Sequence, residues 1–176
     1  MNVIFLDIDG VLNSQQYSIR FYDIIHSKQK VNVDSWQFID PECLDRILQI
    51  CMVTNAKLII SSSWRHHNYV NTIDDFKKYE SLYKLVPHII GITPRSEARI
   101  RGKEIKYLLD NWKQSADDGY INKYYRDLPL FDYVILDDDK DMLPEQMSHF
   151  IQTDWTVGLT EYQKEEIIKR FTKIEK

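Results

Sequence analysis

Polar side chains follow three apolar runs of the sequence, at the point where each run ends. The groups are Asp7 and Asp9 after residues 3–6, the serines 61–63 after residues 57–60, and the aspartates 137–139 after residues 133–136. Each run is short and contains β-branched residues, which predicts a buried strand that ends in a loop. Ligands of open parallel α/β sheets bind beyond the carboxyl ends of the strands, so we expect these polar groups to converge on one crevice.

Carboxylates that share a crevice repel one another unless they take up protons or a cation. Oxygen ligands without neighbouring histidine or thiolate favour Mg²⁺ over zinc. Serine hydroxyls and backbone amides can bind a phosphate group, and Lys103, at the start of a predicted helix after Gly102, can supply positive charge. A carboxylate nucleophile with a second acid nearby divides phosphoryl transfer into two easier steps. These residue types therefore predict magnesium-dependent phosphoryl chemistry.

The segments between these groups alternate between predicted helices and strands. A helix is expected to open at Asp40-Pro41-Glu42, because Asp caps free amides and Pro suits the first helical position. A strand, a helix and a strand in this order favour a parallel sheet with a right-handed crossover. The remaining predictions are a helix over 69–83, a short strand over 89–92, a helix after Gly102 that includes Trp112, a polar linker over 115–127, a weak strand between 151 and 157, and a closing helix over 161–174.

Length and composition fit one α/β domain over residues 1–176, with small insertions at about 13–38 and 66–98. The formal net charge of −4 argues against a broad basic surface for nucleic acid. Cys43 and Cys51 fall within one predicted helix, too far apart for a disulfide. No apolar run approaches the ~20 residues that span a bilayer. We therefore expect a cytoplasmic protein with no membrane partner.

The polar groups and their order along the chain resemble the haloacid dehalogenase (HAD) superfamily of aspartate-nucleophile phosphatases. The matching segments are Asp7-Ile8-Asp9-Gly10-Val11, Ile60-Ser61, Lys103 and Ile135-Leu136-Asp137-Asp138. The finer text at 61–65, 90–94 and 101–105 resembles a small branch of the superfamily that is associated with RNA-repair proteins. The resemblance implies a Rossmann-like three-layer α/β/α fold with a central parallel sheet.

The resemblance also implies catalytic roles. Asp7 would attack phosphorus and form an aspartyl-phosphate, while Asp9 would protonate the leaving group and later activate water. Ser61 would bind the phosphoryl oxygens, with Ser62 as the alternative if the register is one residue off. Lys103 would hold Asp7 and the phosphate together.

The same resemblance implies a Mg²⁺ site formed by Asp7, the backbone carbonyl of Asp9, and either Asp138 or Asp137. The triple-Asp run leaves the choice between the last two open. Gly10 and Arg65 complete the predicted substrate-binding set.

The insertions are too short for a large cap domain, so we expect an open site. Such a site suits a phosphorylated macromolecule, such as a nucleic-acid end or a phosphoprotein, while a nucleotide or small phosphometabolite stays an alternative. The competing classes are a receiver-like signalling domain, a catalytically silent Mg²⁺-binding module and a dehalogenase. Steady turnover of a phosphate ester distinguishes the hydrolase from the first two, and halide displacement needs no metal.

Overall fold

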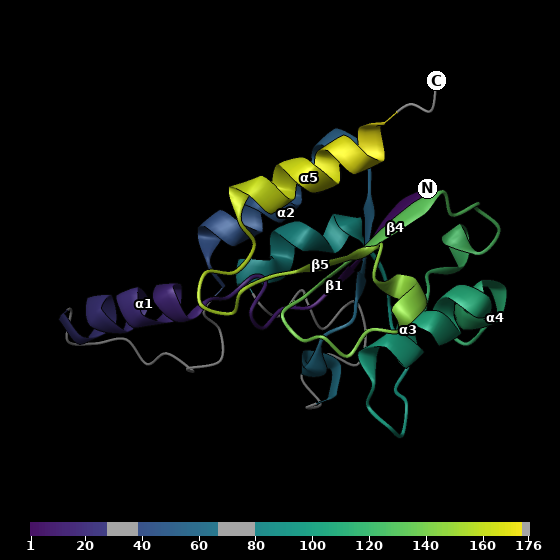
Figure 1. The fold of residues 1–176 in the computed structure, drawn as a ribbon, viewed down its shortest axis with the longest axis horizontal. Coiled ribbons are helices and arrows are strands. Elements are labelled where there is room, and N and C mark those ends of the chain that lie inside the picture. The colour runs from purple at the N-terminus through teal and green to yellow at the C-terminus, as the bar shows by residue number, and fades with distance from the viewer. Residues whose placement is uncertain (28–38, 67–79, 174–176) are drawn as a thin grey trace.

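The computed structural model describes residues 1–27, 39–66 and 80–173, and it has three layers around a five-stranded sheet (Figure 1). The strands are β1 (Asn2–Leu6), β2 (Lys57–Ile60), β3 (Ile89–Ile92), β4 (Asp132–Asp137) and β5 (Phe150–Gln152). The helices are α1 (Gln15–Ser27), α2 (Pro41–Thr54), α3 (Arg101–Asp110), α4 (Trp112–Asp117) and α5 (Glu161–Thr172). Short 3-10 helices cover Ser63–His66, Glu80–His88, Lys123–Tyr125 and Pro144–Gln146.

The strand order is β3-β2-β1-β4-β5, and every neighbouring pair is parallel. The predicted parallel sheet and the Rossmann-like α/β fold class are therefore confirmed. The fifth strand covers only residues 150–152, at the beginning of the stretch in which a weak strand was expected. Because all strands run in one direction, the polar residues that follow β1, β2 and β4 lie at the same edge of the sheet.

Different helices cover the two faces of the sheet. α2 and α5 pack on the face that contains Leu6, whereas α3 and α4 pack on the face that contains Phe5. Residues two apart in a strand point to the same face, so Asp7 continues the side of Phe5 and points towards α3. The alternating direction of side chains along β1 therefore places Asp7 on the face that α3 covers.

Helix α2, in the connection from β1 to β2, begins where its predicted capping residues lie. The Asp40 carboxylate accepts a hydrogen bond from the Glu42 amide at 2.9 Å, and Pro41 occupies the first helical position. The helix ends at Asn55, whose φ of 53° is a left-handed conformation that asparagine adopts readily. On the other face, the helix expected to include Trp112 is instead divided at Asn111 into α3 and α4.

The stretch 115–127 packs against the folded core through a few buried residues, so its prediction as a linker is wrong. Ser115 and Ile121 are buried, and the Ile92 amide donates to the Tyr120 carbonyl at 2.9 Å. An isolated antiparallel bridge joins Gly91 to Ile121. Tyrosines and charges gave this segment a polar composition, but its few apolar residues are enough to attach it along β3.

The two predicted insertions are only partly described. The first begins with α1, which projects from the body of the molecule (Figure 1), and residues 28–38 lie outside the described residues. Most of the helix expected over 69–83 also lies outside them, and residues 80–88 form a 3-10 helix. In the described ranges 1–27, 39–66 and 80–173, none of the helices has the length and apolar character needed to span a bilayer.

Candidate active site

Two buried carboxylates lie side by side at the carboxyl ends of β1 and β4. Leu6 pairs with Leu136, and the Asp7 amide donates to the Leu136 carbonyl at 2.9 Å, so Asp7 and Asp137 follow neighbouring strand ends. Asp7 is 4% exposed and Asp137 is 0% exposed. This register brings two negative charges together in a place with little water.

Arg101, the first residue of α3, lies against both carboxylates. Its Nη2 atom is 3.5 Å from Asp7 Oδ2, and its Nε atom is 3.2 Å from Asp137 Oδ2. The close packing of α3 on the segment before β5 makes this approach geometrically possible, because a Cβ on Gly102 would lie 2.6 Å from the Leu143 amide nitrogen. One guanidinium thus offsets part of the charge of two buried acids.

Asp9 lies at the exposed entrance to this group. Its Oδ2 accepts a hydrogen bond from the Trp64 indole at 2.9 Å, and its Oδ1 accepts one from the Asn13 side chain at 2.8 Å. Asn13 also accepts from the Gly10 amide at 2.8 Å. These two hydrogen bonds fix the Asp9 carboxylate at the entrance, where it could exchange a proton with a leaving group.

A glycine is required at position 10 because the loop after β1 comes very close to the side chain of Asp138. Its φ is +67°, and a Cβ there would lie 2.4 Å from the Cγ atom of Asp138. The Gly10 carbonyl also accepts a hydrogen bond from Thr153 at 2.8 Å. Gly10, predicted to bind substrate, has a clear packing function because it lets Asp138 reach the loop that follows β1.

The two predicted phosphate-binding serines have different surroundings. The Ser62 hydroxyl lies close to Asp7 and lowers the pKa of that carboxyl, in opposition to burial. The Ser61 hydroxyl is fully buried and has no hydrogen-bond partner in the part of the chain that is described. The contact with Asp7 therefore favours Ser62, the alternative that the sequence left open.

Two predicted site cations form no ion pair with Asp7 or Asp137 in the described ranges. Lys103 is exposed on α3, and no ion pair joins it to Asp7 within the described ranges. Arg65 is buried, but its guanidinium pairs with Glu104. The guanidinium that reaches Asp7 belongs to Arg101, two residues before Lys103.

The whole-chain comparison agrees with this arrangement of strand-end groups. Residues 3–163 match the family model described as the HAD domain in Swiss Army Knife RNA repair proteins. The chain belongs to this family. No curated protein and no solved structure gives a match.

The HAD domain has an oxygen-only set of side chains suited to a hard cation. Asp7, Asp137 and Asp138 each offer a carboxylate oxygen, and the three oxygens lie within 4.8 Å of one another. Asp137 Oδ2 is buried and accepts no hydrogen bond from the described residues. Three carboxylates with one guanidinium leave an excess of negative charge when ionised, and oxygen donors are those that Mg²⁺ prefers. The residues present therefore fit Mg²⁺.

Burial strongly perturbs the pKa values of two of these acids. Loss of solvation raises the pKa of Asp7 to about 6, although the Arg101 charge and the Ser62 hydroxyl act in the opposite direction. Loss of solvation and the neighbouring Asp7 charge raise the pKa of Asp137 to about 8, although Arg101 again lowers it. Both groups thus gain from a divalent cation that stabilises their ionised forms.

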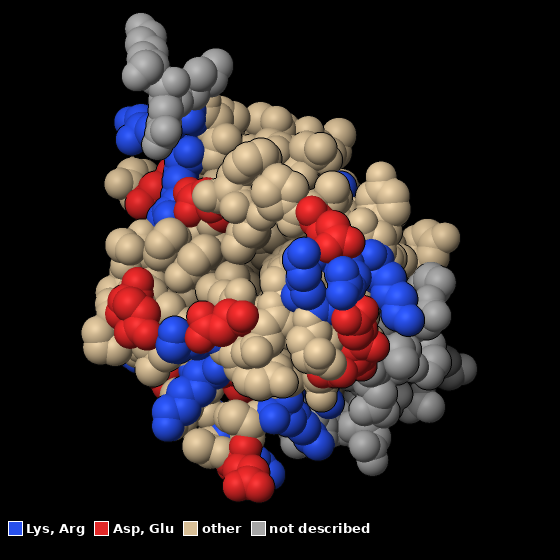
Figure 2. All heavy atoms as spheres, turned by 90° about the vertical axis from the view of Figure 1, so that its right-hand side faces the viewer, with Lys and Arg blue, Asp and Glu red and all other residues tan. Residues whose placement is uncertain are grey.

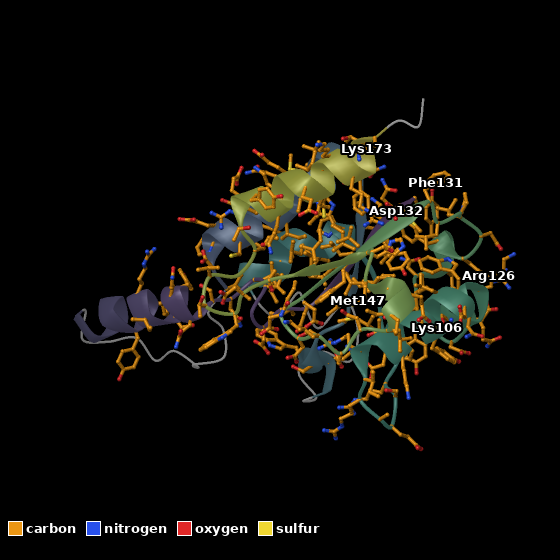
Figure 3. The ribbon with its side chains drawn as sticks, in the orientation of Figure 1. Lys106, Arg126, Phe131, Asp132, Met147 and Lys173 are labelled. Carbon is orange, nitrogen blue, oxygen red and sulfur yellow. The ribbon has the colours of Figure 1, made fainter. Side chains whose placement is uncertain are left out.

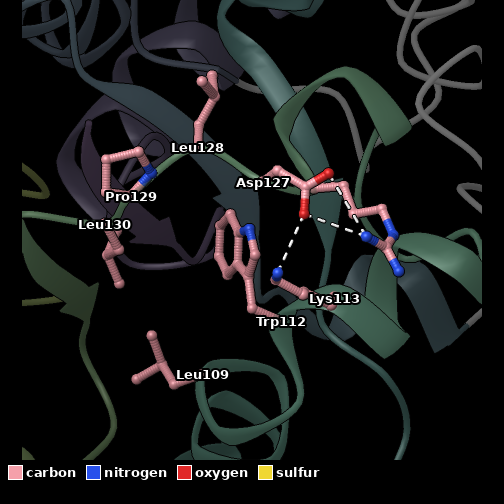
Figure 4. Close-up of a pocket in the computed structure, with 8 residues that line it drawn as sticks. Leu109, Trp112, Lys113, Asp127, Leu128, Pro129 and Leu130 are labelled. Atoms are coloured by element: carbon pink, nitrogen blue, oxygen red, sulfur yellow. Dashed lines mark hydrogen bonds and ion pairs between the residues drawn. The ribbon is translucent and has the colours of Figure 1, made fainter.

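Two hollows of the HAD domain differ in their relation to these acids. A cavity of about 410 Å³ adjoins the site and is lined by Asp138, Gln152, Thr153, Asp154, Trp155, Thr160 and Gln163. A second, of about 260 Å³, is lined by α3 and α4 residues and the segment 126–130 before β4 (Figure 4). In the second, Lys113 and Arg126 both pair with Asp127. Because β4 begins beside this segment and ends at Asp137, only the first cavity adjoins the acids.

The raised acid pKa values predict an unusual pH dependence of stability. The ordinary value of 3.8 for Asp7 and Asp137 lies below their folded-state pKa values, so the folded protein retains protons that the unfolded chain has lost. Their stabilising contribution is complete at low pH and is lost as pH rises through about 6 and about 8. In a chelator, Tm is expected to fall between about pH 4, where the unfolded carboxyls ionise, and about pH 8, where folded Asp137 has also lost its proton, and to fall less in Asp137→Asn.

Thermal unfolding of the two proteins with and without Mg²⁺ measures this effect. At the alkaline end Mg²⁺ should raise Tm, because it binds the deprotonated carboxylates of the folded state. The same slope of Tm against pH in wild type and Asp137→Asn, both in chelator, would contradict the assignment of this dependence to Asp137.

Proposed function

We propose that this HAD domain is a Mg²⁺-dependent phosphomonoester hydrolase that acts through an aspartyl-phosphate on Asp7. The observation that carries the proposal is the position of Asp7 between Asp137, Arg101 and Ser62 at the carboxyl edge of the sheet. A nucleophilic carboxylate needs negative charge on itself and positive charge around the phosphate that it attacks. Arg101 and Ser62 both favour the ionised form of Asp7 against the effect of burial, and the Arg101 charge lies where the attacked phosphate would be.

The chain's own groups divide the reaction into two steps. A carboxylate oxygen of Asp7 forms a bond to phosphorus, the bond from phosphorus to the leaving oxygen breaks, and Asp9 gives that oxygen a proton. Asp9 then takes a proton from a water molecule, whose oxygen attacks phosphorus and releases inorganic phosphate and Asp7. Mg²⁺ held by Asp7, Asp137 and Asp138 supplies charge neutralisation to the phosphoryl oxygens when it is bound.

Arg101 is proposed to act as the cation that the sequence assigned to Lys103. The Arg101 guanidinium already lies 3.5 Å from Asp7 Oδ2, where it can also face an equatorial phosphoryl oxygen. Ser62 is proposed as the hydroxyl that binds a second phosphoryl oxygen. Lys103, on the exposed side of α3, is left without a direct part in this version of the mechanism.

The substrate is proposed to be a phosphorylated nucleic-acid end. The family name refers to RNA repair, and the cavity beside Asp138 includes Trp155, whose side chain is 54% exposed. Indole faces stack on nucleobases without strong sequence preference. Arg95 and Arg99 are exposed on the segment that leads from β3 to Arg101, where they can meet backbone phosphates.

A broad basic surface is not part of this proposal. Figure 2 shows a face on which Lys and Arg side chains are interspersed with Asp and Glu and are separated by uncharged surface. Contacts to a few phosphates near the scissile ester suffice for an enzyme that acts on ends, and their number is measurable as the salt dependence of binding.

Replacement of the nucleophile tests the reaction itself. With Mg²⁺ and an aryl phosphate, Asp7→Asn is expected to lower kcat by more than about 10³-fold, because the amide oxygen is a poor nucleophile. Asp118→Asn, at an exposed position that follows α4, is the matched control and should retain full turnover. Wild-type turnover in Asp7→Asn would refute the aspartyl-phosphate mechanism.

Paired alanine variants distinguish the two candidate cations. Arg101→Ala removes the charge next to Asp7 and is expected to lower kcat by about 10²-fold or more. Lys103→Ala, two residues away on the same helix, is expected to change kcat by less than about threefold because no charge near Asp7 is lost. Steady-state kinetics at saturating Mg²⁺ measures both, and the reverse order of effects would return the role to Lys103.

The indole beside the site tests the class of substrate. Trp155→Ala is expected to raise KM for a 5′- or 3′-phosphorylated oligonucleotide by about tenfold, because base stacking is lost, and to leave KM for a sugar phosphate unchanged. Phe131, an aromatic residue that is 78% exposed, lies beside Asp132 at the start of β4 (Figure 3), and Phe131→Ala is the control. Equal preference of the wild-type enzyme for oligonucleotide and sugar phosphates would remove the nucleic-acid proposal.

A further inference from the structure

A second pair of buried charges lies behind the candidate site. Arg65, in the 3-10 helix Ser63–His66 that follows β2, forms an ion pair with Glu104 in the first turn of α3. The two side chains are 3% and 2% exposed. Neither belongs to the group of carboxylates around Asp7, and the proposed reaction uses neither as a chemical group.

The hydrogen bonds of this pair connect three segments of the chain. Arg65 Nη1 donates to the Ser62 carbonyl at 2.9 Å, while its Nη2 faces Glu104. The other Glu104 oxygen accepts from the Ser96 amide at 2.9 Å and from the Ser96 hydroxyl at 3.2 Å. The pair therefore fixes the loop after β2 and the loop after β3 against the start of α3.

Two of these segments carry the side chains that contact Asp7. Ser62, whose hydroxyl lowers the pKa of Asp7, is held through its own carbonyl by Arg65. Arg101, which pairs with Asp7, lies three residues before Glu104 on α3, so the two side chains project from neighbouring positions of one helix. A shift of the pair would move both contacts of the nucleophile.

Stability alone does not account for a buried pair of this kind. Removal of two charges from water costs so much that a buried ion pair is often no more stabilising than apolar residues of similar size. Burial lowers the pKa of Arg65 to about 10 despite the adjacent Glu104, and Arg65 Nε has no hydrogen-bond partner in the described residues. Such costs are tolerated where geometry matters for function.

We propose that Arg65 and Glu104 form a positioning pair that sets the distances from Ser62 and Arg101 to Asp7. The inference rests on the proposed hydrolase function and replaces the sequence-based expectation that Arg65 binds the phosphate. The planar guanidinium is needed because one side chain must donate to a carbonyl and to a carboxylate in fixed directions. The pair acts through Ser62 and Arg101 and does not touch the substrate.

The double variant Arg65→Met/Glu104→Leu tests the proposal, because both charges are removed together and no unpaired buried charge remains. We expect cooperative unfolding with Tm close to wild type. With p-nitrophenyl phosphate and Mg²⁺, kcat is expected to fall by about 10- to 100-fold, as for misplaced catalytic groups, and KM to change by less than about threefold. Wild-type kcat and KM in the folded double variant would overturn the proposal.

Arg65→Lys provides a second measurement that does not depend on the fate of the double variant. Lysine keeps the charge opposite Glu104 but lacks the fixed fork that also reaches the Ser62 carbonyl. A positioning function predicts a folded protein with a kcat reduced by about tenfold, whereas full kcat in this variant would overturn the need for the fork.

An ion pair at the other end of β4 supplies the matched control. Arg170 on α5 contacts both Asp132 oxygens, at 2.6 and 2.8 Å, and Asp132 begins the strand that ends at Asp137. Asp132→Leu/Arg170→Met is expected to leave kcat within about threefold of wild type, since it moves no group near Asp7. An equal loss of kcat in both double variants would overturn the positioning inference, whereas a wild-type protein without Mg²⁺-dependent hydrolysis would overturn the proposed function itself.

Discussion

The approach of two buried carboxylates at the ends of neighbouring parallel strands is the constraint on which the rest of the site depends. Asp7 and Asp137 are brought together by the register of β1 and β4, which the hydrophobic core fixes. Their mutual repulsion in a poorly hydrated place requires protons or positive charge. Arg101, on α3, supplies one positive charge. The pKa values of Asp7 and Asp137 are nevertheless raised, so one guanidinium compensates their negative charge only in part.

Backbone packing at two glycines lets the neighbouring groups come close enough. At Gly10 the loop after β1 touches the side chain of Asp138, and at Gly102 the start of α3 touches the backbone near Leu143. A methyl group at either position would meet atoms at less than 3 Å. The positions of Asp138 and Arg101 therefore follow from close contacts of the main chain as well as from electrostatics.

The sequence predicts β1, β2 and β4 well because each contains a continuous apolar run that ends in acids or serines. Asp7, Asp9 and the acids after β4 could be assigned to one edge without any structure. The sequence could not show whether Arg101 or Lys103 is the cation beside Asp7. That depends on which residue begins α3 and on the rotation of about 100° per residue along the helix.

The burial of Arg65 and of part of the stretch 115–127 could not be predicted from sequence composition. Arg65 follows a predicted phosphate-binding strand, and a cation in that place is readily taken for a substrate contact. Its partner Glu104 lies 39 residues away along the chain, and nothing in local spacing connects them. The polar stretch over 115–127 was misread for a similar reason, since Ile121 attaches it to β3 through long-range contacts.

The two buried charge groups differ in net charge, and this difference separates their functions. The charges of Arg65 and Glu104 balance each other, and the pair connects Ser62 to α3. The group formed by Asp7, Asp137, Asp138 and Arg101 is unbalanced when its acids ionise. The same imbalance that opposes folding at alkaline pH would favour a divalent cation beside Asp7, so in the proposed mechanism cation affinity arises from charge that the fold leaves uncompensated. In this proposal, the neutral pair Arg65–Glu104 positions Ser62 and Arg101, and the negatively charged group around Asp7 binds the cation. Both groups lie near the carboxyl ends of the strands.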